Sequence, residues 1–317
     1  MISPMPSRNR PPIKIRPVRR SRRSAVRVRD TRFSWLVLAI PLGLYMIFGF
    51  FPMLEALLLS FTNWSLLTLH GQFVGLANYA YLLTSTTFWE AFKNTVWFML
   101  VTNLGSIALG LALAVLLNRR TRITSTARAI LYVPSVLSVV VVSEMFIYLL
   151  GPSPGSLINW VVHWIGIAPQ NWLANPRLAL PSLMFLTVWQ GMGWTMVFYL
   201  AGLQGIPATL YEAAKIDGAT GWRAFRHITL PLLRPVTTLL LILGYFNGFQ
   251  VFGQMQLMTL GGPDNRTMSL VLYLYDEGFQ YYHMGYASAI GMVLFLVTFL
   301  VSLVQLQRSR RQFSTLY

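Results

Sequence analysis

Six long apolar stretches, separated by short polar segments, dominate the sequence. They lie at about residues 35–60, 93–117, 127–150, 181–203, 236–258 and 285–306. A helix needs about 20 predominantly apolar residues to cross a bilayer. Charged residues make up only 11% of the chain, against about 25% in typical soluble domains, so they could not coat a soluble surface of this size. The sequence therefore predicts an all-α polytopic membrane protein with six transmembrane helices.

The positive charges alternate along the chain. All but three of the 25 Lys and Arg residues lie before the first stretch, after the second, after the fourth or after the sixth. The exceptions are Lys93, Arg177 and Arg266. Cytoplasmic segments carry the excess of Lys and Arg, so both termini are predicted to be cytoplasmic. The net charge of +16 thus reflects membrane orientation, and nucleic acid is not expected as a partner.

The chain divides into one membrane domain and two tails. Residues 1–32 form a basic tail, expected to be disordered in the cytoplasm and to touch anionic membrane lipid. The apolar run from Trp35 to Phe61 is too long for a signal-peptide core of about 7–15 residues, so we expect a retained first span. The six-helix membrane domain covers 33–308, and 309–317 form a cytoplasmic tail. Without cysteine, the chain cannot form disulfides or thiolate sites.

The cytoplasmic loop 205–235 has the residues of a rigid helix–turn–helix. Pro207 is suited to a helix start, and Ala208–Asp217 consists largely of helix formers. Gly218 can adopt the left-handed conformation that ends helices, and Thr220 can cap a second helix. Two later prolines are expected to end that second helix before the next span.

Small residues are expected on the exposed face of this loop. Ala213 and Ala214 would let another protein's backbone approach closely. Glu212, Lys215 and Asp217 surround them with charge. A loop that only connects two spans needs neither a small ridge nor a fixed turn, so we expect a docking surface here.

The spacing of particular residues in this loop resembles the EAA motif, which marks the transmembrane subunits of bacterial binding-protein-dependent ABC importers. The corresponding residues are Glu212, Ala213, Ala214, Asp217, Gly218, Ile228, Leu230 and Pro231. The motif lies in a cytoplasmic loop before the penultimate span, as it does in that family. The resemblance implies the type I ABC importer permease fold.

Further strings resemble the carbohydrate-type permeases of the maltose and glycerol-3-phosphate kind. They are Gly75-Leu76-x-Asn78-Tyr79, Phe88-Trp89, Asn94-Thr95, Phe249-Gln250-Val251-Phe252, Thr259-x-Gly261-Gly262-Pro263 and Gly285-x-Ala287-x-Ala289. The resemblance extends from about Trp35 to Gln307. It departs from the family at Leu260, where members often have glycine.

The resemblance implies a subunit that has no enzymatic activity and no cofactor. Consistently, the chain has no G-x-x-x-x-G-K-[ST] phosphate loop. The expected partners are an ABC ATPase dimer that docks on the loop around Glu212, a second permease subunit with which the chain forms a heterodimer, and an extracytoplasmic solute-binding protein. The expected substrate is a sugar or a related polyol or glycoside, and the expected location is a bacterial or archaeal plasma membrane.

Polar residues inside spans are candidates for contacts with the substrate, since such groups are costly in lipid unless they face a cavity. Asn247, Gln250 and Gln254 are spaced by three and four residues, which predicts one face of a helical fifth span. Tyr245 and Phe249 add aromatic surface suited to sugar rings. Weaker candidates are Asn103, Glu144 and Gln190. The alternative for each residue is a hydrogen bond between helices.

Two alternative functions, ATP-independent transport and intramembrane catalysis, would require other sequence features. An ATP-independent secondary transporter or channel would need ionisable residues within its spans, yet Glu144 is the one clear case. An intramembrane enzyme would need a catalytic motif, but the four histidines lack H-E-x-x-H spacing and no Gly-x-Ser-x-Gly string occurs.

Overall fold

The computed structural model describes residues 28–119, 121–219 and 221–313. Within these ranges the regular secondary structure is helical, and two isolated β-bridges pair Thr62 with Phe73 and Ser65 with His70. Four helices are long and apolar enough to cross a membrane: Val37–Leu59, Thr86–Leu116, Ala179–Gln204 and Met284–Gln305. Two bent helix pairs raise the number to six if each pair is one span. The all-helical class is confirmed, while six spans and cytoplasmic termini remain predictions.

The chain divides into two units, Met1–Met53 and Leu54–Tyr317, which are described separately. The first unit contains α1 (Val28–Tyr45), the π-helical turn η1 (Met46–Phe50) and the start of α2 (Phe51–Leu59). The N–H of Phe51 donates to the carbonyl of Met46, five residues earlier. This wide turn immediately precedes Pro52, which has no N–H to offer. Helix α1 begins inside the segment predicted as a tail, and residues 1–27 lie outside the described part.

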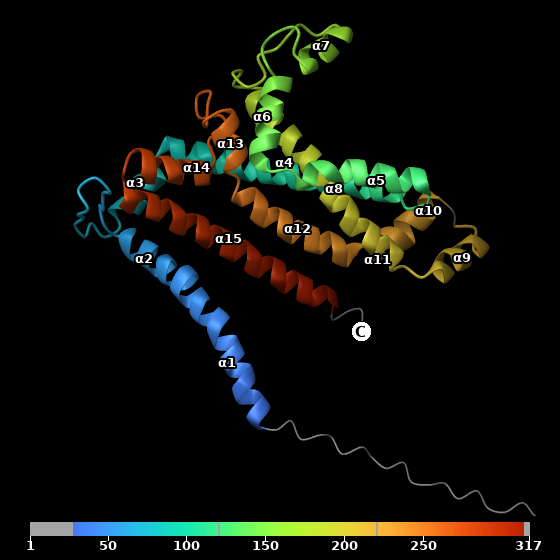
Figure 1. Ribbon diagram of the computed structural model, residues 1–317, viewed down its shortest axis with the longest axis horizontal. Coiled ribbons are helices and arrows are strands. Elements are labelled where there is room, and N and C mark those ends of the chain that lie inside the picture. The colour runs from blue at the N-terminus through green and yellow to red at the C-terminus, as the bar shows by residue number, and fades with distance from the viewer. Residues whose placement is uncertain (1–27, 120, 220, 314–317) are drawn as a thin grey trace, which may run out of the picture. The chain divides into compact units, whose positions relative to one another are not determined.

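Helix α4 (Thr86–Leu116) is the central element of the second unit (Figure 1). It packs against α8 (Ala179–Gln204) and α12 (Arg234–Phe249), while α15 (Met284–Phe313) packs against α12. Two glycines let α4 and α12 approach closely. A Cβ atom at Gly248 would lie 2.6 Å from Cγ of Met99, and one at Gly244 would overlap the Asn103 side chain. Small residues spaced by four commonly bring membrane helices into contact in this way.

The predicted third span is a broken helix. The sequence predicts one helix over 127–150, but the structure has α5 (Arg122–Val136) and α6 (Val139–Leu149) at an angle of 100°. Pro134 lies in the last turn of α5, and a proline weakens a helix by removing a donor. Ser138 then begins α6, because its side-chain oxygen accepts a hydrogen bond from the N–H of Val141 at 3.4 Å.

The predicted fifth span is also interrupted. Helix α12 ends at Phe249, residues 250–252 are not helical, and α13 occupies Gly253–Met258. The prediction of one helix over 236–258 is therefore wrong. The side chain of Ser269 donates a 2.8 Å hydrogen bond to the Val251 carbonyl. That bond satisfies a backbone group that the break would otherwise leave without a partner.

The segment between α6 and α8 is held by one buried asparagine. Asn159, on α7 (Leu157–Trp164), is fully buried. Its Nδ2 donates to the carbonyls of Gly151 and Gln170, and its Oδ1 accepts from Nε1 of Trp172 at 2.8 Å. Trp172 thus points into the protein. Trp160 and Trp164, on the same segment, are exposed.

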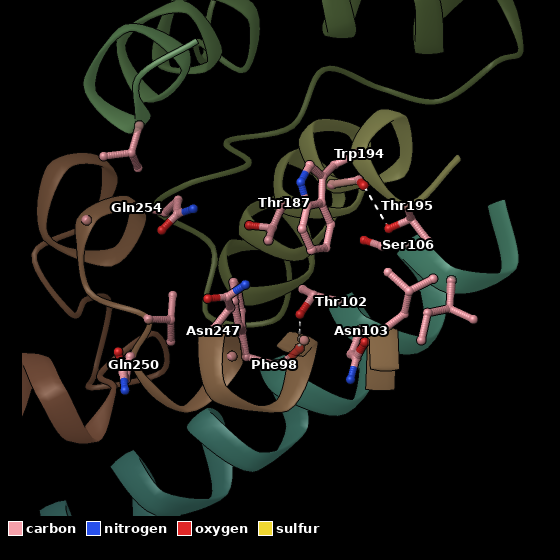
Figure 2. Close-up of a pocket in the computed structure, with 18 of the residues that line it drawn as sticks. Phe98, Thr102, Asn103, Ser106, Thr187, Trp194, Thr195, Asn247, Gln250 and Gln254 are labelled. Atoms are coloured by element: carbon pink, nitrogen blue, oxygen red, sulfur yellow. Dashed lines mark hydrogen bonds between the residues drawn. The ribbon is translucent and has the colours of Figure 1, made fainter. Parts of the chain in front are cut away.

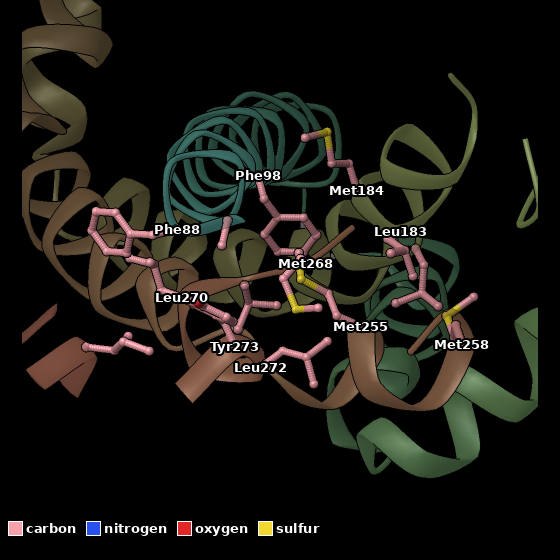
Figure 3. Close-up of a cluster of buried hydrophobic side chains, with 14 of the residues drawn as sticks. Phe88, Phe98, Leu183, Met184, Met255, Met258, Met268, Leu270, Leu272 and Tyr273 are labelled. Atoms are coloured by element: carbon pink, nitrogen blue, oxygen red, sulfur yellow. The ribbon is translucent and has the colours of Figure 1, made fainter. Parts of the chain in front are cut away.

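A methionine-rich core joins residues of several helices (Figure 3). It contains residues of α4, α8, α13 and α14 (Leu270–Tyr275), which is followed by the π-helical turn η3 (Asp276–Gln280). Its members include Phe98, Leu183, Met184, Met255, Met258, Met268 and Leu272. The short α13 contributes to this core and packs against α6.

Asn94 and Thr95 attach the segment before α14 to the first turns of α4. The Nδ2 of Asn94 donates to the carbonyls of Asn265 (2.8 Å) and Met268 (3.1 Å). The hydroxyl of Thr95 accepts from the N–H of Leu270 at 3.0 Å. The two residues therefore have a structural role.

Replacement of Asn94 by leucine is expected to destabilise the protein. It would leave two carbonyls without their donor, which costs on the order of 1–3 kcal/mol. Thermal unfolding of the purified protein in detergent should show a lowered melting temperature. Thr298→Val is the control, because that hydroxyl donates only within its own helix. Equal melting temperatures for Asn94→Leu and the wild type would contradict this assignment.

Candidate functional site

The loop predicted to dock a partner contains the short helix α9 (Ala208–Ile216), followed by a fixed turn. Gly218 has a φ of +72°. Its N–H donates to the carbonyl of Lys215 (3.1 Å), and the N–H of Ala219 donates to the carbonyl of Ala214 (2.8 Å). This pair of bonds is the Schellman motif, in which glycine tolerates the left-handed conformation at little cost. The predicted left-handed cap at Gly218 is confirmed.

A second helical segment leads from this turn to the membrane helix α12. It consists of α10 (Trp222–Ala224), the π-helical turn η2 (Phe225–Thr229) and α11 (Leu230–Leu232). The N–H of Leu230 donates to the carbonyl of Phe225 just before Pro231. The helix then bends by 61° before α12 begins at Arg234. Thr220, the predicted cap of the second helix, lies outside the described residues.

The two helical arms are joined, and their exposure differs from the prediction. The hydroxyls of Tyr211 and Thr229 lie 2.9 Å apart, which joins α9 to η2. Ala213 is exposed, but Ala214 is 8% exposed, so the prediction that both alanines face outward is wrong. The reason is that α9 turns this side toward the second arm. We call residues 207–232 the elbow. Figure 1 shows α9 beyond the end of α8, beside α10.

The exposed surface of the elbow is more apolar than the sequence prediction assumed. Ile216 is 87% exposed and Trp222 is 71% exposed. Glu212 and Asp217 are also exposed, Ile228 is half-buried, and Leu230 is partly exposed. Large apolar side chains beside charges are typical of protein interfaces. The sequence prediction did not include Ile216 and Trp222 as exposed residues. Which side of each helical arm faces outward depends on the turn between the arms, and the turn is seen only in the structure.

A cavity of about 320 Å³ lies between α4, α8, α12 and α13 (Figure 2). Its polar side chains come from four elements: Thr102, Asn103 and Ser106 on α4, Thr187, Trp194 and Thr195 on α8, Asn247 on α12, and Gln250 and Gln254 around the break. We call it the amide cavity. A cavity with amides, hydroxyls and an indole can hydrogen-bond a polar ligand and offer it an apolar surface.

The structure brings the three predicted amide side chains together, but not on one continuous helix as predicted. Asn247 is on α12, Gln250 is the residue at which that helix ends, and Gln254 is on α13. They do not share one face of a continuous helix, so the prediction that they lie on one face of a helical fifth span is wrong. They line the same cavity because the helix is interrupted at 250–252, and α13 beyond the break packs against α6.

The two predicted aromatic residues lie elsewhere. Tyr245 and Phe249 are buried and contribute to a second, largely apolar cavity of about 650 Å³ between α4, α12 and α15. Their ring centroids are 4.8 Å apart, and the Tyr245 hydroxyl donates to the Val297 carbonyl at 3.4 Å. Asn103 reaches both cavities, so the five predicted pathway residues are divided between two spaces that share one wall.

The weaker candidates for substrate contact lie in different surroundings. The side chain of Gln190 donates to the carbonyl of Leu137 at 3.1 Å, and Glu144 is exposed on α6. Trp194, which the sequence prediction did not include, lines the amide cavity. An indole in the middle of a span was the available signal. In the ranges that the structure describes, no group of His, Cys, Asp and Glu residues could hold a metal ion.

Residues 106–313 match the family described as "Binding-protein-dependent transport system inner membrane component". The chain belongs to this family. It is therefore a multi-pass inner-membrane subunit of an ABC transporter, and ATP hydrolysis occurs in a separate partner. The matched segment contains the whole elbow and most of the amide cavity.

Similar proteins support this placement. The chain is 36% identical over 267 residues to "Arabinooligosaccharides transport system permease protein AraP" of Bacillus subtilis (strain 168), covering 84% of each protein. It is 32% identical to "Trehalose/maltose transport system permease protein MalF" of Thermococcus litoralis, covering 90% of this chain and 97% of that one. A solved bacterial alginate ABC transporter, in complex with its alginate pentasaccharide-bound periplasmic protein, has a chain that superposes with a TM-score of 0.78 at 26% identity, covering 89% of this chain and 96% of that one.

Gly218→Val should abolish uptake while the protein still reaches the membrane. A side chain at Gly218 would meet nothing within 4 Å, so the expected defect comes from the left-handed backbone, which costs about 1–2 kcal/mol for residues other than glycine. Uptake in cells that lack the native copy is the measurement. Gly218→Asn is the matched control, since asparagine tolerates this conformation and should retain uptake. Normal uptake by the valine variant would contradict a role for the fixed turn.

Proposed function

We propose that this chain lines the pathway of a sugar, or of a related polyol or glycoside, that an extracytoplasmic binding protein delivers. The observation that carries the proposal is the amide cavity. Asn247, Gln250 and Gln254 meet there with Trp194 of α8. Amide groups donate and accept hydrogen bonds, as sugar hydroxyls do, and an indole offers a flat apolar surface for a sugar ring. The volume lies near the lower end of small-molecule sites, which are about 300–1,000 Å³.

The substrate class rests on the relatives as well as on the cavity. Those reported above are named for arabinooligosaccharides and for trehalose and maltose. The structural neighbour is named for alginate. All three are carbohydrates. The polar lining of the amide cavity contains no charged side chain, which favours a neutral sugar over an acidic one.

The elbow is the proposed docking site for the ATPase. Its turn is fixed by two backbone hydrogen bonds, its arms are joined by Tyr211 and Thr229, and Ile216 and Trp222 are exposed beside Glu212. A rigid projection transmits a displacement to the helix that follows it, which here is α12. Closure of the ATPase dimer on ATP would move the elbow and α12 as one body, in a form of alternating access by rigid-body movement.

A second permease subunit and six spans complete the proposal. Arg122–Val136 and Val139–Leu149 would together form the third span, and Arg234–Phe249 would belong to the fifth, with Trp222–Leu232 outside the membrane as part of the elbow. Both termini would be cytoplasmic, as the distribution of Lys and Arg predicts. The resemblance to carbohydrate-type permeases favours a heterodimer in which the partner forms the other side of the pathway.

The amide cavity is tested by Asn247→Leu combined with Gln250→Leu. Removal of two hydrogen-bonding groups, each worth on the order of 1 kcal/mol, should raise the KM for uptake about tenfold or more. Tyr245→Phe, which removes only a hydroxyl of the neighbouring cavity, is the matched control. Uptake of arabinooligosaccharides and of trehalose by the complete transporter is measured. An unchanged KM and an unchanged choice of sugar would reject this cavity as the site.

The absence of cysteine allows a direct test of orientation. A single cysteine in place of Leu67, which is 71% exposed, should react with a membrane-impermeant maleimide in intact cells or spheroplasts. One in place of Asn118, which is exposed after α4, should react only after lysis. The reverse pattern would overturn the predicted topology, and with it the docking of an ATPase on the elbow.

A further inference from the structure

A cluster of hydrogen bonds joins the break in the third span to the middle of α8. The hydroxyl of Ser135, in the last turn of α5, donates to the carbonyl of Gln190 at 2.7 Å and accepts from the N–H of Trp194 at 3.0 Å. In a regular α-helix, the N–H of a residue pairs with the carbonyl four residues earlier. Ser135 therefore contacts both backbone groups of one i→i−4 pair of α8.

The contact is reciprocal. The side chain of Gln190 donates to the carbonyl of Leu137 at 3.1 Å. Leu137 is the residue between the two arms of the broken span, and carbonyls at the end of a helix lack partners within the helix. Helix α5 thus supplies a hydroxyl to α8, and α8 supplies an amide to the end of α5. We call this pair of contacts the serine clasp.

Close packing makes the clasp possible. A Cβ atom at Gly193 would overlap the carbonyl oxygen of Leu131 and lie 3.0 Å from the Ser135 hydroxyl. Only glycine at this position lets α5 approach α8 closely enough for a hydroxyl as short as that of serine to reach the backbone.

The clasp lies directly behind the amide cavity. Gly191, Trp194 and Thr195 belong to the same turn of α8 and line the cavity. Val139, the first residue of α6 after the break, lines it too. The opposite end of α5 begins at the short loop after α4, where Thr121 and Thr124 form a capping box. Helix α5 therefore connects that loop with the wall of the cavity.

The clasp also has two arrangements that satisfy α8. Because α8 is a continuous helix, the N–H of Trp194 and the carbonyl of Gln190 can pair with each other without Ser135, so that withdrawal of α5 leaves no unpaired backbone group on α8. The turn that carries Trp194 is then no longer held by α5. A contact of this kind can open and close without the cost of a buried unsatisfied group.

We propose that Ser135 is a positioning residue, which holds the turn of α8 that carries Trp194 against the amide cavity and releases it when α5 moves. This inference rests on the proposed function, because it makes the movement of α5 part of the transport cycle. On this proposal, the wall of the amide cavity formed by the Trp194 turn of α8 opens through movement at the break in the third span, and not through the elbow alone.

The test measures how fast a cysteine in the amide cavity is labelled, and not sugar uptake. Thr187→Cys puts one thiol in the cavity of a chain that otherwise has none. The complete transporter with its ATPase and partner permease is labelled with a water-soluble maleimide, once without nucleotide and once trapped with ATP and vanadate. With Ser135 present, the two labelling rates should differ by about fivefold, which is within the range that one hydrogen bond can give. Adding Ser135→Ala should reduce the ratio to below about twofold, and Ser135→Thr, which keeps the hydroxyl, should restore it.

Two matched variants separate positioning from folding. Gln190→Leu removes the other half of the clasp and should reduce the labelling ratio in the same direction. Ser182→Ala, on the same helix, removes a hydroxyl that donates only to Leu178 of its own helix and should leave the ratio unchanged. ATPase activity is measured in every sample.

An unchanged labelling ratio in Ser135→Ala would overturn the inference, even in a transporter that imports sugar normally, and would leave the proposed function intact. Equal losses of ATPase activity, labelling and complex yield in Ser135→Ala would show that the hydroxyl only holds the fold, and would overturn it too. Failure of the proposed function would appear separately, as sugar uptake that does not respond to changes at Asn247 and Gln250.

Discussion

Lipid cannot hydrogen-bond a free carbonyl or N–H, and this constraint governs the two helix breaks beside the amide cavity. The chain interrupts its helices beside the amide cavity, and at each place a side chain from another element supplies the missing bond. Ser269 serves the carbonyl of Val251, and Gln190 serves that of Leu137. Irregular backbone therefore occurs where the protein itself provides partners, and those places are also the ones that line a cavity.

The same constraint links the two candidate sites. The elbow is stiff because its turn satisfies its own backbone through Gly218 and Ala219. The amide cavity lies where α12 ends at Phe249 and α13 begins after the break. Helix α12 connects the two, since it begins directly after the elbow and ends at the cavity. A displacement of the elbow would thus reach the cavity through a single helix, while α5 approaches the same cavity from the other side through the serine clasp.

The sequence predicted residues better than it predicted geometry. Asn247, Gln250 and Gln254 were selected for a shared helical face that does not exist, yet they line one cavity. Helical periodicity could not reveal the break after Phe249, because no proline or glycine occurs at 250–252. The donor that compensates for the break, Ser269, is distant in sequence. Tyr245 was expected at the same site but faces α15, since periodicity does not tell which neighbour lies on each side of a helix.

By itself, the sequence determined the solvent of this protein, the chemistry of the elbow and the family. Apolar length, the positions of Lys and Arg, and the spacing from Glu212 to Pro231 depend only on neighbours along the chain. Only the tertiary structure decided that Ala214 is buried while Ile216 and Trp222 are exposed, and that Trp194 faces a cavity. It also decided that Ser135 contacts the backbone of α8. These features require helices far apart in sequence to meet, and their meeting depends on small residues such as Gly193 and Gly248 whose partners no local pattern identifies.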